Sequence, residues 1–513
     1  MKGTPNALAS AGGRLVIKVA VVLTMFTLVL AVHYASPAWA DTFTVTNLND
    51  SGPGSLRAAM NAAEAKAGAD EIVFADGVSG TITLASTLPM VTDPAGLVID
   101  GGGDVTVSGN EQVQIFSVGE GAALSLRSLT LSSGLARAED GGAINNVGGT
   151  VVVTNSTVSR NEATFLGGGI HNIGGGAVTI TNSTISGNTT GLQSVGGGIY
   201  NENSTLEVIN STFSNNGNGA IRNRNSTLEV TNSTFSDHQS GTIASEFSST
   251  AKVTNSTFTG NRGGVLNGFN STLEVTNSTF LGTRGSAVLN VLNGTLEVTN
   301  STFSGNRGVG RRCDAFGDCV EFELPGGGIY NSGGTTQVTN STFSGNSAST
   351  GSAIFNGNDF NGNEGKTTLR NTIVANSTSG GNCGGEVPIT DGGYNIDDGS
   401  TCGFTQATGS LPNTNPLLDP AGLADNGGQT QTIALQPDSP AVDLVGQDAC
   451  PPPETDQRGV ERPQGEACDA GAFELVQSPQ TKADCKQGGW EEFGFNNQGR
   501  CVAFVNRAAR NND

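Results

Sequence analysis

Residues 226–237 read STLEVTNSTFSD, and the same pattern returns at residues 204–216 (STLEVINSTFSNN) and 271–283 (STLEVTNSTFLGT). Leucine and valine alternate with glutamate here, so the apolar side chains face one side of a strand and the glutamate faces the other. The asparagine that follows tolerates the left-handed backbone of a sharp corner. The pattern therefore predicts two short strands, the second over Thr-Phe-Ser, joined at an asparagine.

The triplet Asn-Ser-Thr occurs twelve times, and eight copies keep a regular phase. These eight lie at Asn155, Asn182, Asn210, Asn232, Asn255, Asn277, Asn300 and Asn340, with steps of 27, 28, 22, 23, 22, 23 and 40 residues. The last step contains an insertion with Arg311-Arg312 and Cys313 to Cys319. A glycine-rich GGIYN segment, seen at 197–201 and 327–331, supplies a third strand.

A period of this length indicates a repeat architecture. Propeller blades need about 40–45 residues, and leucine-rich repeats need several leucines per unit. Three short strands with three bends fit 22–28 residues, so we expect an all-β, three-sided parallel β-helix solenoid. Its coils would stack about 4.8 Å apart.

Stacking predicts ladders of equivalent side chains along the rod. One is an internal aromatic column that continues Val158 and Ile185, formed by Phe213, Phe235, Phe258, Phe280 and Phe303. Another is a structural ladder of corner amides that hydrogen-bond from coil to coil, formed by Asn210, Asn232, Asn255, Asn277 and Asn300.

Two charged ladders are the candidate binding residues. The outward position of the first strand gives Glu207, Glu229, Glu274 and Glu297, interrupted by Lys252. The turn after the second strand gives Arg262, Arg284 and Arg307. Each ladder is interpreted either as a solvated face or as a shallow strip that binds cations or sugars.

The composition excludes several classes of protein. Glycine accounts for 75 of 513 residues, aromatics for 5% and charged residues for 14%, which argues against a disordered acidic tail, collagen or a helical bundle. The formal charge is −21. Such a chain should repel nucleic acid and anionic lipid, so neither is an expected partner.

The first forty residues predict an export signal. Lys2, Arg14 and Lys18 precede an apolar run over 19–32, and Ala38-Trp39-Ala40 offers a cleavage site. At about 14 residues the run is short for a bilayer, which needs about 20. We expect a secreted or surface-associated product with no membrane span after cleavage.

Cysteine usage agrees with export, because all eight cysteines follow residue 312 and an even number favours disulfides. We pair neighbours: Cys313 with Cys319, Cys383 with Cys402, Cys450 with Cys468, and Cys485 with Cys501. The chain has no CxxC motif and no histidine cluster, so no metal site is expected.

The ends of the solenoid need caps. Residues 55–66 form the one good helix candidate, with Ser55 as its N-cap, and we assign it as the N-terminal lid. The expected plan is a signal at 1–40, an N-terminal cap at 41–75, β-helix repeats at 76–380, a C-terminal cap domain with disulfides at 381–475, and a small cysteine-containing tail at 476–513.

Motifs at both ends resemble a known group. Residues 50–59 (DSGPGSLRAA) resemble the N-terminal module named after a Cys-Ser-Leu-Arg-Glu-Ala signature, with Gly54 and Ala58 in place of its Cys and Glu. Residues 415–420 (NPLLDP), 423–430 (LADNGGQT), 434–441 (ALQPDSPA), 456–459 (DQRG) and 468–474 (CDAGAFE) resemble the choice-of-anchor Q domain. The resemblance covers residues 42–475 and implies a secreted bacterial right-handed β-helix of the pectin-lyase-like class, whose activity is generally unassigned.

Two functions follow from these observations. The first is a structural or adhesin-like surface protein that binds polysaccharide by many shallow contacts. The alternative is a pectate-lyase-like or other polysaccharide-degrading enzyme. A hydrolase needs two carboxylates at a defined separation, and the Gly-His-Gly and Arg-x-Lys motifs of pectin hydrolases are absent. We therefore assign no catalytic residue and no cofactor, and leave calcium open.

Overall fold

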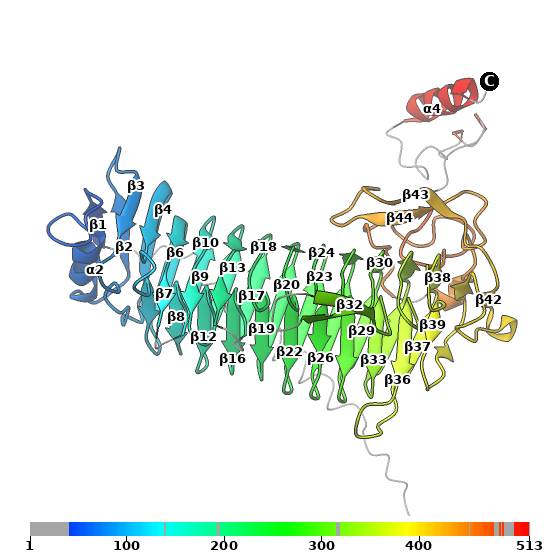
Figure 1. Ribbon diagram of the computed structural model, residues 1–513. Coiled ribbons are helices and arrows are strands. Elements are labelled where there is room, and N and C mark those ends of the chain that lie inside the picture. The colour runs from blue at the N-terminus through cyan, green and yellow to red at the C-terminus, as the bar shows by residue number, and fades with distance from the viewer. Residues whose placement is uncertain are drawn as a thin grey trace, which may run out of the picture.

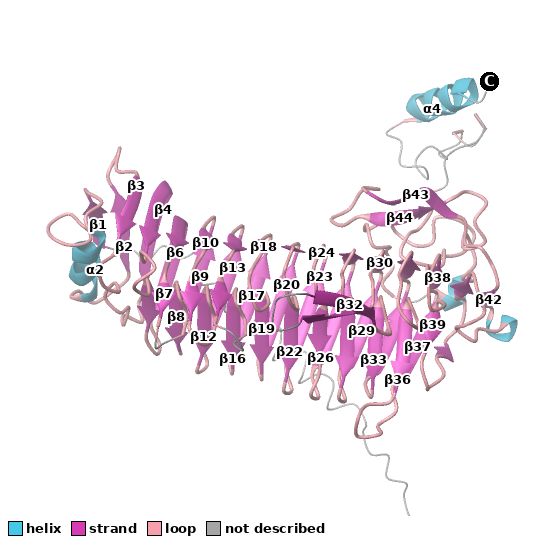
Figure 2. Ribbon diagram, viewed as in Figure 1, coloured by secondary structure: helices cyan, strands magenta, loops and turns pink. Residues whose placement is uncertain are grey.

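The chain winds into a rod of stacked coils (Figure 1). This computed structural model describes residues 41–137, 140–191, 195–313, 319–450, 452–476, 482–483, 485–486 and 497–511, so the predicted export signal lies outside the described residues. Strands dominate the described part (Figure 2). Its helical segments are α2 (Leu56–Glu64), α4 (Gln498–Asn511), and the short 3-10 turns η1 (Gln406–Thr408) and η2 (Gln447–Ala449).

Each repeat adds one strand to each of three sides. The Thr-Leu-Glu-Val-Thr side contains β9 (Thr150–Thr154), β13 (Ala177–Thr181), β17 (Thr205–Ile209), β20 (Thr227–Thr231), β23 (Thr250–Thr254), β26 (Thr272–Thr276), β29 (Thr295–Thr299), β34 (Thr335–Thr339) and β37 (Lys366–Arg370). The Thr-Phe-Ser side contains β10 (Thr157–Ser159), β14 (Thr184–Ser186), β18 (Thr212–Ser214), β21 (Thr234–Ser236), β24 (Thr257–Thr259), β27 (Thr279–Leu281), β30 (Thr302–Ser304), β35 (Thr342–Ser344) and β38 (Ile373–Ala375).

The Ile-Tyr-Asn side contains β5 (Phe116–Val118), β8 (Ile144–Val147), β12 (Ile170–Ile173), β16 (Ile199–Glu202), β19 (Ile221–Arg224), β22 (Ile243–Glu246), β25 (Val265–Asn267), β28 (Val288–Val291), β33 (Ile329–Ser332), β36 (Ile354–Gly357) and β39 (Cys383–Gly384). Equivalent strands on each side pair in parallel and in register. The predicted three-sided parallel β-helix is confirmed.

Further strands start and end the stack. It begins with β1 (Asp41–Val45), β2 (Asp70–Phe74), β3 (Gly80–Thr83), β4 (Leu97–Ser108) and β6 (Ala123–Ser132), and a small separate sheet contains β7 (Leu135–Ala136), β11 (Glu162–Ala163) and β15 (Thr189–Thr190). It ends with β40 (Thr390–Asp391), β41 (Ile396–Asp397) and β42 (Leu411–Pro412), so parallel pairing continues past residue 380.

The predicted helical lid is present at the N-terminal end. The Ser55 hydroxyl accepts a hydrogen bond from the backbone N–H of Ala58, which is the expected N-cap interaction. The helix buries Leu56 and Met60 against the first coils and stops at Glu64, slightly before the expected end. It therefore covers apolar surface that the first coil would otherwise expose.

The predicted aromatic column is confirmed inside the rod. Successive rings of Phe213, Phe235, Phe258, Phe280 and Phe303 stack nearly parallel, with centroids 4.6 to 4.9 Å apart. Phe343 extends the column by one coil at 4.5 Å. The register also places Val158 and Ile185 at the start of the same column.

The predicted bonding of the corner asparagines is wrong. Asn210, Asn232, Asn255, Asn277 and Asn300 do adopt the left-handed conformation, with φ between 46° and 50°. Within the described residues, however, their amides do not hydrogen-bond to one another. The left-handed corner turns the asparagine side chain outward and the next serine inward, so the serines form the ladder: the Ser211 N–H donates to Ser233 Oγ at 3.1 Å, and the Ser233 N–H donates to Ser256 Oγ at 3.1 Å.

A buried amide ladder lies elsewhere, on the Ile-Tyr-Asn side. Its asparagines donate from Nδ2 to Oδ1 of the next coil at 2.6 to 3.0 Å, and all are fully buried. They are Asn146, Asn172, Asn201, Asn223, Asn267, Asn290, Asn331 and Asn356, with Ser245 standing in for one coil. This ladder pairs most of its polar atoms inside the core, and among the described residues Oδ1 of Asn146 and of Asn267 has no donor.

His238 occupies an asparagine position in a second buried ladder. The Asn216 N–H donates to His238 Nδ1 at 3.2 Å, and the His238 N–H donates to Asn261 Oδ1 at 3.1 Å. Burial lowers the pKa of His238 to about 4. The folded state therefore holds the neutral ring, whereas the unfolded chain protonates near pH 6.5.

The free energy of unfolding should consequently fall as the pH drops from about 6.5 towards 4. The His238 contribution to this loss is about 3 kcal/mol. Urea unfolding of wild type and His238→Asn across this range measures it. The variant should lose less stability on acidification, and identical pH profiles would contradict the assignment.

The C-terminal segment folds back along the Thr-Phe-Ser side (Figure 1). It includes the antiparallel strands β43 (Leu418–Ala424) and β44 (Thr432–Leu435). Gln457 joins it to two coils, because Thr302 Oγ1 donates to its Oε1 at 2.6 Å and its Nε2 donates to Thr279 Oγ1 at 2.9 Å. The Ala472 N–H also donates to Thr342 Oγ1 of β35, and Ile373 of β38 packs against the segment, so it covers coils from β27 to β38 on this side.

Three predicted disulfides are confirmed: Cys383–Cys402, Cys450–Cys468 and Cys485–Cys501. The insertion forms an antiparallel hairpin, β31 (Val309–Cys313) and β32 (Cys319–Glu323), in which Cys313 and Cys319 are opposite each other. The side chains of these two cysteines lie outside the described part of the chain.

Candidate functional site

The predicted glutamate ladder lies on the outer face of the Thr-Leu-Glu-Val-Thr side. Register pairs Glu207 with Glu229, Glu229 with Lys252, Lys252 with Glu274, and Glu274 with Glu297. Thr179 Oγ1 donates to Glu207 at 3.4 Å. No hydrogen bond or ion pair joins the ladder's members to one another in the described structure. Lys252, Glu274 and Glu297 are exposed, and Glu207 and Glu229 are partly exposed.

The predicted arginines form a second row on the turn after the Thr-Phe-Ser side. Each arginine donates its backbone N–H to a backbone carbonyl of the preceding coil, and this fixes the three arginines at equivalent positions. The pairs are Arg262 with His238, Arg284 with Asn261, and Arg307 with Thr283. All three are exposed. Arg284 forms an ion pair of 3.1 Å with Glu321 of the inserted hairpin.

A third region, which the sequence reasoning missed, lies at the corner between the Ile-Tyr-Asn side and the Thr-Leu-Glu-Val-Thr side. We call it the aromatic corner. Its pocket of about 430 Å³ is open and is lined by Glu202, Asn203, Arg224, Asn225, Phe247, Ser248, Phe269 and Asn270.

The backbone of this corner explains why the phenylalanines are exposed. One coil uses Asn203 and the next uses Asn225 as a single left-handed residue, with φ of 50° and 49°. In the next two coils, three residues instead of two separate the inward ladder position, Ser245 or Asn267, from the following serine. These coils place Phe247 and Ser248, and then Phe269 and Asn270, in consecutive left-handed positions with φ of 54° to 63°.

A bulky side chain in the left-handed region is strained by about 1–3 kcal/mol, whereas asparagine or glycine adopts it readily. Phe247 and Phe269 are also 39% and 36% exposed, so more than a third of each side chain remains open to a ligand. Strained and partly exposed residues of this kind are candidates for ligand contact.

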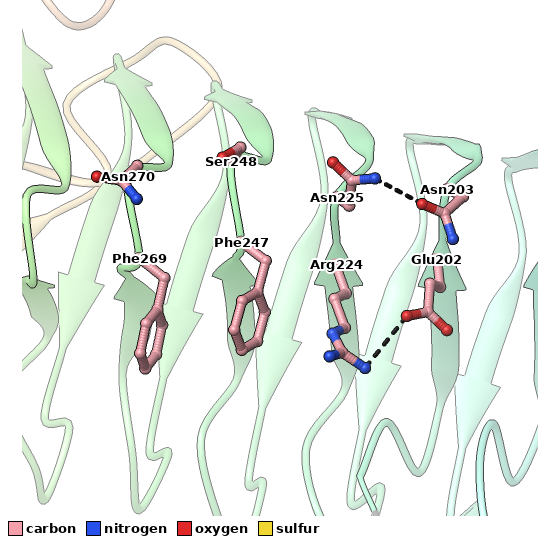
Figure 3. Close-up of a pocket in the computed structure, with 8 residues that line it drawn as sticks. All are labelled: Glu202, Asn203, Arg224, Asn225, Phe247, Ser248, Phe269 and Asn270. Carbon is pink, nitrogen blue, oxygen red and sulfur yellow. Dashed lines mark hydrogen bonds and ion pairs between the residues drawn. The ribbon is translucent and has the colours of Figure 1, made fainter.

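The side chains line up along the rod axis (Figure 3). Glu202 Oε1 lies 3.2 Å from Arg224 Nη1, and the Arg224 guanidinium lies 4.6 Å from the ring centroid of Phe247. The Phe247 and Phe269 rings stack at 4.8 Å with an 11° angle between their planes. Asn225 Nδ2 donates to Asn203 Oδ1 at 2.5 Å at the rim. The corner thus presents apolar rings beside amide and charged groups.

A buried polar row supports this arrangement. Tyr200 Oη donates to Glu202 Oε2 at 3.2 Å, and the Tyr200 ring stacks on His171 at 5.7 Å. His171 Nδ1 is 2.9 Å from Asn145 Oδ1, and its Nε2 is 3.6 Å from Asp140 Oδ2. Burial lowers the pKa of His171 and raises that of Tyr200, so both are neutral near pH 7. Both are at most 4% exposed. Tyr200 positions Glu202 through its hydroxyl group, and His171 packs against the Tyr200 ring.

A second ion pair holds the neighbouring strand ends. Arg222 pairs with Glu246, whose pKa is raised by burial although Arg222 opposes the shift. Among the described residues, no group of three or more histidine, cysteine, aspartate or glutamate side chains is arranged to hold a metal ion. No helix in this part of the chain is long and apolar enough to cross a membrane.

Comparison with known proteins defines the family. The model for the right handed beta helix region matches residues 93–280 and 168–363. These matches together span more than half of the chain, and the chain belongs to this family. No curated protein matches it.

Three solved structures are similar to it. Pectate lyase Pel9A has 13% identity over 86% of this chain and 98% of that chain, with a TM-score of 0.32. The catalytic unit of a thermostable GH87 alpha-1,3-glucanase from Streptomyces thermodiastaticus strain HF3-3 has 14% identity over 70% and 69%, with a TM-score of 0.39. A PL6 alginate lyase in complex with a trisaccharide has 13% identity over 76% and 91%, with a TM-score of 0.38. At these identities the likeness concerns the fold alone.

Proposed function

We propose that this chain is a secreted or surface-associated, adhesin-like protein that binds a polysaccharide chain at the aromatic corner and does not cleave it. The observation that carries the proposal is the pair of partly exposed rings in left-handed positions, Phe247 and Phe269, where the two preceding coils use Asn203 and Asn225. Aromatic rings with a few placed polar groups are the usual lining of a small-molecule site.

The chemistry of the corner suits a sugar chain. The rings offer apolar surface to the C–H groups of a sugar, and the amides of Asn203, Asn225 and Asn270 can hydrogen-bond its hydroxyl groups. The charges of Glu202 and Arg224 compensate each other, so the pocket favours no net charge on the ligand. An extended sugar chain can run along the rod axis, because successive coils place their corner residues in a row in that direction.

The corner continues beyond the pocket. Leu292 occupies the position after Phe269, because the Asn270 N–H donates to the Leu292 carbonyl at 3.1 Å. Three coils after Phe269, Phe360 is 85% exposed in the loop after β36. Several weak contacts along one chain add up to useful avidity. Secretion is supported by the predicted signal and by the three disulfides, which persist in oxidising compartments.

Phe247→Gly with Phe269→Gly is the sharpest test of the corner. Glycine adopts the left-handed backbone freely, so the free energy of unfolding should stay within about 1 kcal/mol of wild type. Affinity for the bound polysaccharide should fall at least about tenfold, which corresponds to about 1.4 kcal/mol. Affinity electrophoresis in gels that contain xylan or pullulan, preceded by a glycan array, measures this.

Phe165→Ala is the matched control, because Phe165 is 54% exposed but lies in the loop after β11. It should bind like wild type. Equal binding by the glycine variant and wild type would refute the proposal. Release of reducing ends or unsaturated products from these polymers or polygalacturonate, with or without calcium, would instead favour the enzyme alternative.

A further inference from the structure

We infer a second binding site, for anionic groups on a polysaccharide, at the arginine row of Arg262, Arg284 and Arg307. This site is separate from the aromatic corner and does not depend on it. The first observation is that three like charges stand in register on successive coils, about 4.8 Å apart. Like charges in register repel each other, so the row does not help the coils to stack.

The second observation is that a carboxylate already occupies the middle of the row. The inserted hairpin leaves the coil after Gly308 and returns at Leu324, whose N–H donates to the Gly308 carbonyl at 2.7 Å. Glu321 of β32 then reaches Arg284 at 3.1 Å. Both side chains are about half exposed, at 44% and 52%. The contact is therefore open to water, and a ligand anion can exchange with Glu321.

The hairpin itself does not bury this contact. Val320 and Phe322, which flank Glu321 on β32, are 69% and 48% exposed. In the described structure, β31 and β32 pair only with each other. Arg262 and Arg307 form no ion pair within the described residues. Two guanidinium groups beside Arg284 are thus available to the same ligand.

The chemistry indicates a polymer with regularly spaced carboxylate or sulfate groups. Arginine presents a planar fork of donors that matches either group. The overall charge of −21 opposes the approach of any polyanion. At physiological ionic strength, however, charges more than about 8 Å away are largely screened, so the local row decides binding.

The experiment compares three polymers in affinity electrophoresis and calorimetry at two salt concentrations. Polygalacturonate carries carboxylates, dextran sulfate carries sulfates, and neutral dextran is the control. Wild type should bind one or both charged polymers more tightly than dextran, with an affinity that falls as salt rises. Binding of dextran equal to that of both charged polymers would overturn the inference.

Two sets of variants test the residues. Arg262→Gln with Arg307→Gln should weaken charged-polymer binding about tenfold, with unchanged thermal unfolding. Glu321→Gln should strengthen it severalfold, because it removes the competing carboxylate. No change in either variant would overturn the site. The variant with both Phe247→Gly and Phe269→Gly should bind the charged polymers as wild type does. Loss of charged-polymer binding in this variant would show that the two regions form a single site.

Discussion

Phe258→Ala is expected to lower the free energy of unfolding by about 3–5 kcal/mol. The Phe258 ring is 1% exposed and lies between Phe235 at 4.9 Å and Phe280 at 4.6 Å. Alanine leaves a gap that neither neighbour can fill, because each is held by its own coil. It also interrupts the column on which the stacking of adjacent coils depends. Urea unfolding followed by far-ultraviolet circular dichroism measures the loss.

Phe258→Leu is the matched control, since Ile185 and Val158 show that the column accepts aliphatic side chains. It should cost about 1–2 kcal/mol. A loss below about 1 kcal/mol for Phe258→Ala would mean that the ring is not inside the rod, and the stacking would be wrong.

Asn290→Ala is expected to cost a similar amount, about 3 kcal/mol or more. Asn290 is fully buried, accepts from Asn267 Nδ2 at 2.8 Å and donates to Asn331 Oδ1 at 3.0 Å. Alanine would leave Asn331 Oδ1 buried without its donor, at about 1–3 kcal/mol, and would add the cost of the cavity that the amide leaves. The same urea experiment measures this loss.

Asn290→Ser separates hydrogen bonding from packing. Ser245 already fills the equivalent position two coils away and accepts from Asn223 at 3.4 Å. The serine variant should therefore keep part of the ladder and lose less stability than alanine. Equal losses for the two variants would show that the amide chain contributes nothing beyond volume.

The interior of this protein was largely predictable from its sequence. Period-2 alternation fixes which side of a strand is apolar, and a constant repeat length places equivalent residues one above another. Phe213, Phe235 and Phe258 were therefore assigned to one column correctly. The asparagine ladder was misplaced because alternation stops at a left-handed corner, where the asparagine turns outward and Ser233 turns inward.

The aromatic corner was not predictable from the repeat. Phe247 and Phe269 fall outside the Asn-Ser-Thr pattern, in a segment whose length varies between coils. The available signal was the extra residue before Ser249 and Ser271, which puts a phenylalanine where other coils have asparagine. Its exposure depends on backbone angles that spacing alone does not reveal. Similarly, the contact between Arg284 and Glu321 joins residues 37 positions apart through an insertion that breaks the period.

Hydroxyl-radical footprinting, with and without the polysaccharide that the glycan array selects, tests the central claim most directly. Exposed aromatic rings react with the radical, so the method reports on each phenylalanine separately. Bound polysaccharide should protect Phe247 and Phe269 while Phe165 keeps its reactivity. Unchanged reactivity of Phe247 and Phe269 under saturating polysaccharide would contradict binding at the aromatic corner.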